Sequence, residues 1–476
     1  MSTSTTCWKC LSRPSLLSSQ LSSRIAQVTV SAPFSSTATS LAPPLIRGNN
    51  GPQKGVKGTT AIKKKNRPQQ TGKPPMPGER KALRKRVVLS NTNAIEVQDL
   101  VDLNQETVDG LLKENASGEY TSPVAGKVVG LPGTTVDSLR AIESFKTSQG
   151  WGLFRRPSLL VRKEAIDLTK SLVSAAKDQI TQRLIIDGAR GTGKSLMLLH
   201  AQAAAFAQGW VVINIPEARE LVSATSDYAP IPDTMPQLWT QPTFTSSWLE
   251  KIQKANKTQL DTLKMTKKHN LPIEVPSEIS LSRFLEIGVS DTDVAWPIFQ
   301  AFWDEMNAKD RPPMLLTMDS TSYVMGMTEY RDKAINFIHS HDFVITKLFM
   351  DLFSGAIKMN NGGAVIAATS RSNSPTSISM DLAIMQALQR QAGEKLTRRN
   401  PFERKYDERV DSALRDITVM ELSGVSKAEA RSLMEYWAAS GVLRQRVDEQ
   451  IVAEKWALAG NGVIGEIKRN ALNMRI

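Results

Sequence analysis

The chain has 476 residues, 41% of them hydrophobic and 22% charged, and a formal net charge of +13. A chain of this length and composition can bury two or three domain cores. No apolar run approaches the roughly 18 to 20 residues that a membrane-spanning helix needs, so we expect a soluble protein without a membrane partner.

Positive charge is concentrated at the N-terminus. Residues 1–78 contain eleven Lys or Arg and no Asp or Glu, and the first acidic residue is Glu79. The whole chain has 60 basic and 47 acidic residues, so residues 79–476 hold 49 and 47 of them and carry a net charge of only +2. The folded body is therefore expected to be almost neutral.

Residues 1–46 are predicted to contain a mitochondrial presequence. They are rich in Ser and Thr, contain Arg13 and Arg24, and lack acidic residues. Cationic amphipathic segments of this kind are typical of import into the matrix, whereas a secretory signal needs a continuous apolar stretch. A plain disordered tail is the alternative. The apolar residues that one helical face would gather are Leu11, Leu16, Leu17, Leu21 and Ile25.

Both cysteines of the chain, Cys7 and Cys10, lie in this segment. Their C-x-x-C spacing occurs in redox and zinc sites, but no βαβ pattern and no second ligand pair accompany it. The four histidines show no zinc spacing either. We therefore assign no metal or redox role to these residues.

Residues 47–94 form a basic, low-complexity tail. Prolines and glycines interrupt it, so it cannot bury a core and is expected to be disordered when free. Because Lys and Arg near phosphates release counterions, this tail is predicted to contact RNA, with a solubilising leader as the alternative. Its basic residues include Lys63, Lys64, Lys65, Arg67, Lys73, Arg80, Lys81, Arg84, Lys85 and Arg86.

Residues 95–150 are predicted to be an N-terminal extension of mixed helix and loop, and residues 151–422 the core domain. Short apolar strands alternate with helical segments through this core, which indicates an α/β fold with a parallel sheet. The expected strands are residues 183–187, 210–215, 314–318, 364–369 and 417–420, and the expected helices are residues 163–178, 196–208, 248–264 and 294–306.

Residues 423–476 are predicted to form a small C-terminal helical subdomain, either a lid or a winged-helix-like unit. Ser426 and Glu429 have the spacing of a capping box, which marks the start of a helix. Apolar residues then recur at helical spacing until Gly441 ends the pattern. They are Ala430, Leu433, Met434, Trp437 and Ala438.

The segment 188–195 fits the phosphate-binding pattern G-x-x-x-x-G-K-[ST] at every position. Its glycines let successive N–H groups turn inward as an anion nest, and the following helix directs its positive end at the phosphates. Lys194 is expected to reach the β- and γ-phosphates of a purine nucleoside triphosphate. The predicted nucleotide-binding residues are Gly188, Ala189, Arg190, Gly191, Thr192, Gly193, Lys194 and Ser195, together with Thr369 at the end of the fourth strand.

Magnesium is expected to bind Ser195 and a carboxylate at the end of another buried strand. Asp319 follows the strand 314–318 and is the predicted second ligand, with a simple turn cap as the alternative. Many ATPases place a Glu after this Asp to polarise the attacking water, but here the next residue is Ser320. We therefore assign no catalytic residue and expect at most a weak GTPase or ATPase.

The sequence leaves the bound base open between GTP and ATP. No N-K-x-D element follows a strand, which disfavours the small-GTPase mode of guanine recognition without excluding GTP. Thr369 is placed where a polar side chain could face the γ-phosphate. Arg371 could add charge there, and a surface position suits it equally well.

Several segments, taken in order, resemble the death-associated protein three family. The resemblance covers residues 151–476 and includes the phosphate-binding segment and the strand before Asp319. The other matching segments are Arg155-Arg156-Pro157 with Leu160, Asn214-Ile215-Pro216-Glu217-Ala218, Gln241-Pro242 before Trp248-Leu249, Asn400-Pro401-Phe402 and, more loosely, Ala459-Gly460-Asn461-Gly462, where the family more often has serine first.

This family is the GTP-binding protein of the mitochondrial small ribosomal subunit. The resemblance implies an AAA+-related P-loop core, contacts with ribosomal RNA and neighbouring ribosomal proteins, bridge contacts to the large subunit, and a link to apoptosis. We therefore predict a structural, nucleotide-binding ribosomal component that supports mitochondrial translation. A free mitochondrial AAA+-like NTPase or an apoptosis-related signalling switch is the alternative.

Overall fold

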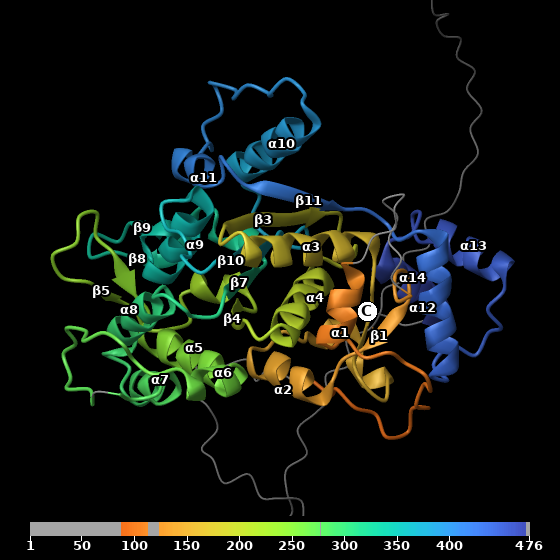
Figure 1. Ribbon diagram of the computed structural model, residues 1–476. Helices are drawn as coiled ribbons and strands as arrows, with labels where there is room; N and C mark the ends of the chain where they lie inside the picture. The colour runs from red at the N-terminus through yellow and green to blue at the C-terminus, as the bar shows by residue number, and fades with distance from the viewer. Residues whose placement is uncertain (1–86, 113–122, 277, 473–476) are drawn as a thin grey trace, which may run out of the picture. The chain divides into compact units, whose positions relative to one another are not determined.

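A computed structural model describes residues 87–112, 123–276 and 278–472 (Figure 1). All of these residues belong to one compact unit, Lys81–Ile476. The predicted presequence and residues 47–86 of the predicted basic tail lie outside the described residues. Within the described ranges, no helix combines the length and the apolar character that crossing a membrane requires.

The centre of the unit is a five-stranded sheet with the order β11-β3-β10-β7-β4. Every neighbouring pair of strands is parallel, which confirms the predicted α/β class with a parallel sheet. The strand that precedes the phosphate-binding segment, β3, lies between β10 and β11. The five strands are β3 (Thr181–Gly188), β4 (Val211–Ile215), β7 (Met314–Asp319), β10 (Gly363–Ala368) and β11 (Thr418–Leu422).

Helices cover both faces of the sheet, because alternate strand residues point to opposite sides. Leu184 and Ile186 pack in one apolar cluster with the helices α1–α4, which lie in front of the sheet in Figure 1, and Ile185 packs in a second cluster behind it. The first group is α1 (Gln105–Leu111), α2 (Gly133–Ala141), α3 (Lys163–Lys177) and α4 (Lys194–Ala207). The second is α5 (Pro242–Ala255), α7 (Leu281–Ser290), α8 (Ala295–Met306), α9 (Val344–Ser354), α10 (Ile378–Ala392) and α11 (Glu408–Ala413).

The N-terminal extension shares the core of the main domain. Strand β1 (Val128–Gly130) pairs antiparallel with β2 (Ser158–Leu160). Leu111 of α1 and Leu139 of α2 are fully buried in the cluster that contains α3 and α4. Residues 95–150 therefore complete one layer of the fold.

The predicted helix 248–264 is two helices that begin earlier than expected. Pro242 occupies the first turn of α5, where its missing N–H costs no hydrogen bond. The buried Asn256 separates α5 from α6 (Lys257–Thr262), and its side chain both accepts from and donates to the backbone of Val212, at 2.7 and 2.8 Å. The helix is interrupted because Asn256 hydrogen-bonds the outer edge of β4. Helix α7 was not predicted, while α8 lies where residues 294–306 were expected to be helical.

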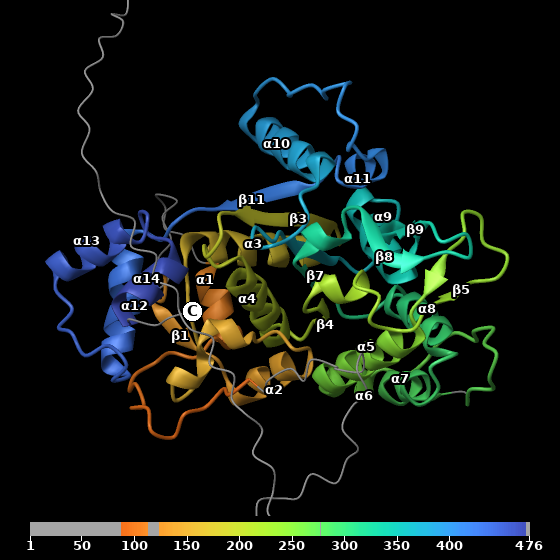
Figure 2. The same ribbon diagram turned by 180° about the vertical axis from the view of Figure 1, so that it is seen from behind.

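Two short hairpins and a group of C-terminal helices complete the unit (Figure 2). The Ser426–Glu429 capping box is formed at the start of α12, as predicted. The described part of residues 423–476 contains helices and no strand, so a β-wing is not part of it. The hairpins are β5 (Ala229–Pro230) with β6 (Trp239–Thr240) and β8 (Met327–Arg331) with β9 (Phe337–His339), and the helices are α12 (Lys427–Ala439), α13 (Glu449–Leu458) and α14 (Ile464–Leu472).

Candidate nucleotide-binding site

The phosphate-binding segment connects β3 to α4. Gly188 ends the strand and Lys194 begins the helix. Gly191 and Gly193 have φ angles of 82° and 98°, in the left-handed region that disfavours any residue with a Cβ. At Gly188 a Cβ would collide with the carbonyl oxygen of Leu422 on the neighbouring strand β11. The backbone shape of this loop therefore requires glycine at these three positions.

The N-terminus of α4 offers unneutralised positive charge. Its first turn contains no acidic residue, and Gly193 provides no side-chain cap. The Nζ of Lys194 folds back over the loop and donates to the carbonyl oxygens of Gly188 and Ala189, at 2.6 and 2.8 Å. Burial lowers the pKa of Lys194, and the nearby carboxylate of Asp187 opposes that shift. An anion is favoured at such a helix end because N–H groups and the helix dipole both point at it.

Three acidic residues lie at the same edge of the sheet as this loop. Asp187 is the second-to-last residue of β3, Asp319 ends β7, and Glu217 follows β4. The register pairs Asp319 with the last residue of β10, Ala368, so that Thr369 follows directly between β3 and β7. The carboxyl ends of parallel strands meet at one edge, where ligands of open α/β sheets bind.

Asp187 is held by Thr369, which was predicted to face the γ-phosphate, and by Arg371, for which a phosphate contact and a surface position were both left open. The Thr369 hydroxyl donates to Asp187 Oδ1, and the Arg371 guanidinium donates to both carboxylate oxygens, with Nη2 2.8 Å from Oδ2. Burial alone would raise the pKa of Asp187, but these hydrogen bonds hold it below its ordinary value. Arg371 also pairs with Asp381, at 2.7 Å. A phosphate contact by Thr369 stays a prediction, because in the structure its hydroxyl is directed at Asp187.

Asp319 is already paired with a cation from the N-terminal extension. Its side chain is 9% exposed, and Oδ2 forms an ion pair with Nζ of Lys146, while Oδ1 accepts from the backbone N–H of Ser320 at 2.7 Å. Nζ of Lys146 also lies 3.7 Å from Oε2 of Glu217. Ser195, the other predicted magnesium ligand, is partly buried in the first turn of α4. The role of Ser195 and Asp319 as metal ligands stays a prediction.

The C-terminal helix α14 lies against the phosphate-binding loop. The N–H of Gly465 donates to the carbonyl oxygen of Gly191 at 2.9 Å. A Cβ on Gly191 would lie 3.3 Å from Cγ1 of Val463, and one on Gly193 would lie 3.4 Å from Cδ1 of Ile464. The loop is therefore covered by residues that come from the opposite end of the domain.

A buried arginine joins the same parts of the chain. Arg162, 4% exposed, donates to the carbonyl oxygen of Thr192 in the loop at 2.9 Å and to that of Ser423 after β11 at 3.0 Å. It also pairs with Glu164 at 2.9 Å. The position of the C-terminal subdomain relative to the loop therefore depends partly on one buried cation.

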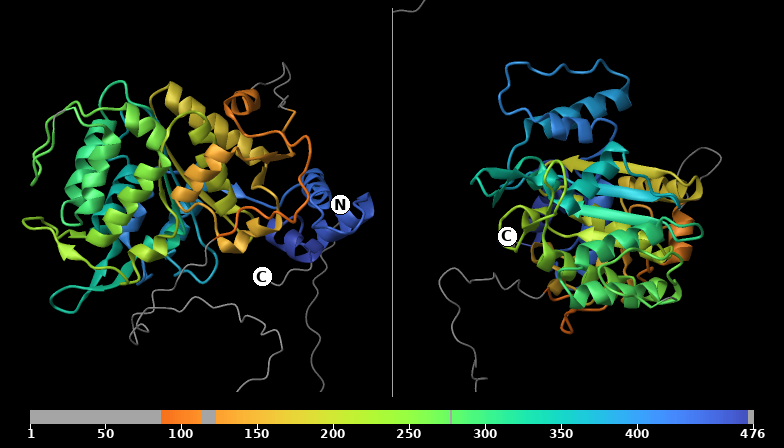
Figure 3. Two further views of the ribbon diagram at one scale, coloured as in Figure 1. Left: turned by 90° about the horizontal axis from the view of Figure 1, so that it is seen from below. Right: turned by 90° about the vertical axis from the view of Figure 1, so that its left-hand side faces the viewer.

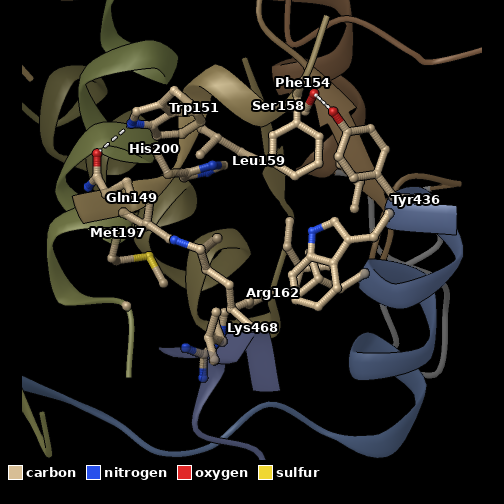
Figure 4. A pocket seen from close by; sticks show the side chains of 18 of the residues that line it. Gln149, Trp151, Phe154, Ser158, Leu159, Arg162, Met197, His200, Tyr436 and Lys468 are labelled. Atoms are coloured by element: carbon tan, nitrogen blue, oxygen red, sulfur yellow. Dashed lines mark hydrogen bonds between the residues drawn. The ribbon is translucent and has the colours of Figure 1, made fainter. Parts of the chain in front are cut away.

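A mostly apolar cavity of about 110 Å³ opens beside the loop (Figure 4). Its walls come from α4, from β2 and the segment before it, and from α12 and α14. The side chain of His200 lines it in neutral form, because burial lowers its pKa to about 4. In Figure 4 the hydroxyls of Ser158 and Tyr436 meet across its rim, 2.7 Å apart. The loop contributes Gly193 to its lining and α4 contributes Leu196, Met197 and His200, while the C-terminal helices contribute Leu433, Tyr436, Trp437, Ile464, Lys468 and Leu472.

The sequence predicted the loop and Asp319 but not their partners. Lys146, Arg162 and Gly465 reach the site from segments that are distant along the chain, and no local pattern marked them. Glu217 carried a usable signal, since it follows a buried strand and a proline, as Asp319 follows its own strand.

Comparisons with known proteins identify relatives of this chain. A family model described as "Mitochondrial ribosomal death-associated protein 3" matches residues 159–470. The chain is 47% identical over 407 residues to "Small ribosomal subunit protein mS29" of Neurospora crassa, with 84% of each chain covered. It is 26% identical over 384 residues to the protein of the same name from Schizosaccharomyces pombe, which covers 76% of this chain and 77% of the relative.

Among solved structures, AMPPCP-bound DnaA from Aquifex aeolicus is similar at a TM-score of 0.24 and 11% identity, covering 64% of this chain and 62% of that one. The family model and the relatives in two fungi confirm the resemblance to the death-associated protein three family that the sequence segments indicated. This chain belongs to the mitochondrial ribosomal death-associated protein 3 family.

Proposed function

We propose that this protein is a structural component of the mitochondrial small ribosomal subunit, located in the matrix, where it supports mitochondrial translation. Family membership supports this proposal, as do the relatives of closely similar length that are named small ribosomal subunit proteins. Its partners on this proposal are the small-subunit ribosomal RNA and neighbouring ribosomal proteins, with bridge contacts to the large subunit.

The proposal includes a bound purine nucleotide, GTP or ATP, in an AAA+-related core. The observation that carries it is the glycine loop 188–193 with its left-handed torsions, followed by the uncapped N-terminus of α4. That arrangement suits the phosphates. The apolar cavity beside Gly193 suits a flat base, since ring faces pack well on apolar walls and Gln149, Ser158 and Lys468 offer polar atoms for its edge.

The donor chemistry at the sheet edge fits Mg²⁺. A hydroxyl and a carboxylate oxygen are ligands of the kind that this hard cation prefers. Asp319 already forms an ion pair with the ammonium group of Lys146. Ser195 and Asp319 would hold the metal, which would neutralise phosphate charge. Lys146 would then keep Glu217 as its partner.

Little or slow hydrolysis is expected from the residues beside Asp319. Ser320, which is buried and in a left-handed conformation with φ 62°, cannot act as a general base at neutral pH.

The alternative function, a free mitochondrial AAA+-like NTPase or an apoptosis-related signalling switch, is favoured by one observation. Glu217 lies at the same edge as Asp319 and shares Lys146 with it, so a carboxylate is present near the expected phosphates.

Sedimentation of native complexes tests the ribosomal assignment. Mitochondrial extract is separated on a sucrose gradient, and the protein is expected to migrate with the small subunit at low and high salt. Migration at the top of the gradient, free of ribosomal RNA, would overturn the proposal.

Identification of the bound nucleotide tests the proposal that the protein holds GTP or ATP. The native protein is denatured and the released nucleotide is analysed, with GTP, GDP, ATP or ADP expected close to one per chain. Lys194→Ala is expected to lose the nucleotide, whereas Lys177→Ala, an exposed lysine at the end of α3, retains it. If native protein and both variants release no nucleotide, binding is refuted while the ribosomal assignment stands.

Phosphate release separates the two functions. Purified protein is expected to release phosphate far more slowly than a motor ATPase, and Glu217→Gln is expected to leave that rate unchanged. Fast turnover that Glu217→Gln abolishes would favour the NTPase alternative.

A further inference from the structure

The connection between α10 and α11, residues 393–407, is an exposed segment away from the nucleotide site that contains five basic and three acidic residues. In Figures 1, 2 and 3 this loop stands clear of the sheet at the far end of α10. Its basic side chains are all solvent-exposed, and the chain gives none of them an acidic partner within the described residues. They are Lys395, Arg398, Arg399, Arg404 and Lys405.

The loop is held in a defined conformation although it is exposed. Thr397 is fixed to α10 by Gln386 and Gln389: the Gln386 amide donates to the Thr397 carbonyl at 2.7 Å, and Gln389 accepts from the Thr397 N–H at 2.7 Å. At the other end, the Asp407 N–H donates to Ser379 at 2.6 Å, and the Asp407 carboxylate bonds His339 at 2.7 Å. One end is therefore anchored to half-buried glutamines of α10, and the other to the buried Ser379 and His339.

A tight turn at the tip of the loop presents an aromatic ring. Asn400 and Pro401 occupy the first two positions of a turn closed by the Glu403 N–H on the Asn400 carbonyl, at 3.2 Å, and the Asn400 side chain accepts from the Phe402 N–H at 3.1 Å. These residue types favour such turns. Phe402 follows at the exposed corner with 88% of its surface accessible. Nearby, the Arg399 guanidinium lies over the Tyr406 ring, 3.7 Å from its centroid.

We propose that residues 393–407 are an RNA-binding loop that takes a single-stranded or looped RNA segment, with a base stacked on Phe402 and phosphates bound by Arg398, Arg404 and Lys405. Cations alone would suit any polyanion. The exposed ring among them favours RNA, because an unpaired base offers a flat face for stacking and an acidic peptide does not. The proposed ribosomal function supplies the source of the RNA, but the loop's chemistry is argued independently of it.

Direct binding to RNA tests this inference. The probe is a labelled, unstructured 12-nucleotide RNA, and affinity for the full chain is measured by fluorescence anisotropy over a range of salt. The triple variant Arg398→Gln, Arg404→Gln, Lys405→Gln is expected to lower the slope of log affinity against log salt by about 2, since each phosphate contact on a single strand contributes about 0.7.

The aromatic part of the proposal has its own signature. Phe402→Ala is expected to lower the affinity for RNA about tenfold, which is the usual contribution of stacking one base. The slope of log affinity against log salt is expected to stay unchanged. The matched control removes three exposed cations elsewhere in the chain, Lys177→Gln, Arg283→Gln and Lys309→Gln, and it is expected to change neither quantity. The basic N-terminus is identical in all variants, so differences between them report on the loop alone.

Two outcomes would overturn the inference. If the triple variant and the control lose the same affinity for RNA and show the same change in salt slope, the loop is not a binding site. If Phe402→Ala has no effect and poly-glutamate binds the unmodified chain as tightly as the RNA does, the loop takes an acidic protein and not RNA. Neither result bears on sedimentation with the small subunit, so this inference and the proposed function fail separately.

Discussion

The sheet edge around residues 188–195 and the loop 393–407 use positive charge in opposite ways. At the sheet edge three cations have a carboxylate partner within the protein: Lys146 pairs with Asp319, Arg371 with Asp187, and Arg162 with Glu164. In the loop the basic side chains are exposed and unpaired within the described chain. Paired, partly buried cations fix the shape of a site, whereas unpaired cations cost the fold little and remain available to a polyanion.

The largest expected effect comes from removing the buried arginine of the sheet edge. Arg162→Met leaves Glu164 without its cation and two carbonyl groups without a donor, so it is expected to lower the free energy of unfolding by about 3 kcal/mol. Urea-induced unfolding of the variant and of the unmodified protein measures this loss of free energy. The paired control in the loop, Arg398→Met, is expected to change stability by less than about 0.5 kcal/mol. Equal losses in the two variants would remove the distinction between the regions.

Asp187 gives a pH-dependent test of the same region. Its pKa is lowered by its hydrogen bonds, so its contribution to stability is complete above the unfolded pKa of about 3.9 and is lost as pH falls through the folded value. Asp187→Asn is therefore expected to cost about 2 kcal/mol at pH 7, with the difference from the unmodified protein shrinking below pH 4.

The control for this variant is Asp381→Asn, the more exposed partner of Arg371, with a side chain 35% exposed. It is expected to cost less than about 1 kcal/mol at pH 7, because solvent screens exposed pairs. A penalty for Asp187→Asn that is constant from pH 7 to pH 2 would contradict the assigned ionisation.

Lys146 tests whether the paired carboxylate is kept for a metal. Lys146→Met frees Asp319, so magnesium is expected to strengthen nucleotide binding about tenfold more in the variant than in the unmodified protein, as loss of a charged hydrogen bond implies. Isothermal titration with Mg²⁺ and with EDTA measures this ratio. Lys251→Met removes a similarly buried lysine paired with Glu143 at 3.0 Å and serves as the control. An unchanged ratio would argue that Asp319 does not meet the metal.

The smallest effect on stability is expected in the loop. Arg404→Gln and Lys405→Gln remove exposed, unpaired charges, so each is expected to shift the free energy of unfolding by less than about 0.5 kcal/mol. Thermal unfolding checks this. A loss above about 1 kcal/mol would mean that these side chains support the fold, and the contrast with the sheet edge would be weaker.

Local sequence patterns determined much of this protein. Glycine spacing before Lys194 predicted the phosphate-binding loop, because left-handed torsions and anion nests are properties of a few consecutive residues. The apolar run before it and the Ala- and Leu-rich segment after it predicted a strand and a helix, and the structure has β3 and α4 there. Buried apolar runs predicted all five strands of the sheet to within two residues of their observed ends. The Ser426 capping box predicted the start of α12 for the same reason.

Tertiary structure alone decided which side chains meet at the site. Lys146 and Asp319 are far apart in the chain, as are Gly191 and Gly465, and only the strand order and the docking of α14 bring them together. The break at Asn256 likewise depends on the edge of β4, which no helical pattern contains. Residue types and spacing encode local torsions and periodicity, whereas charge pairing across the sheet edge depends on contacts between distant segments, so the sequence predicted the loop and the structure supplied its partners.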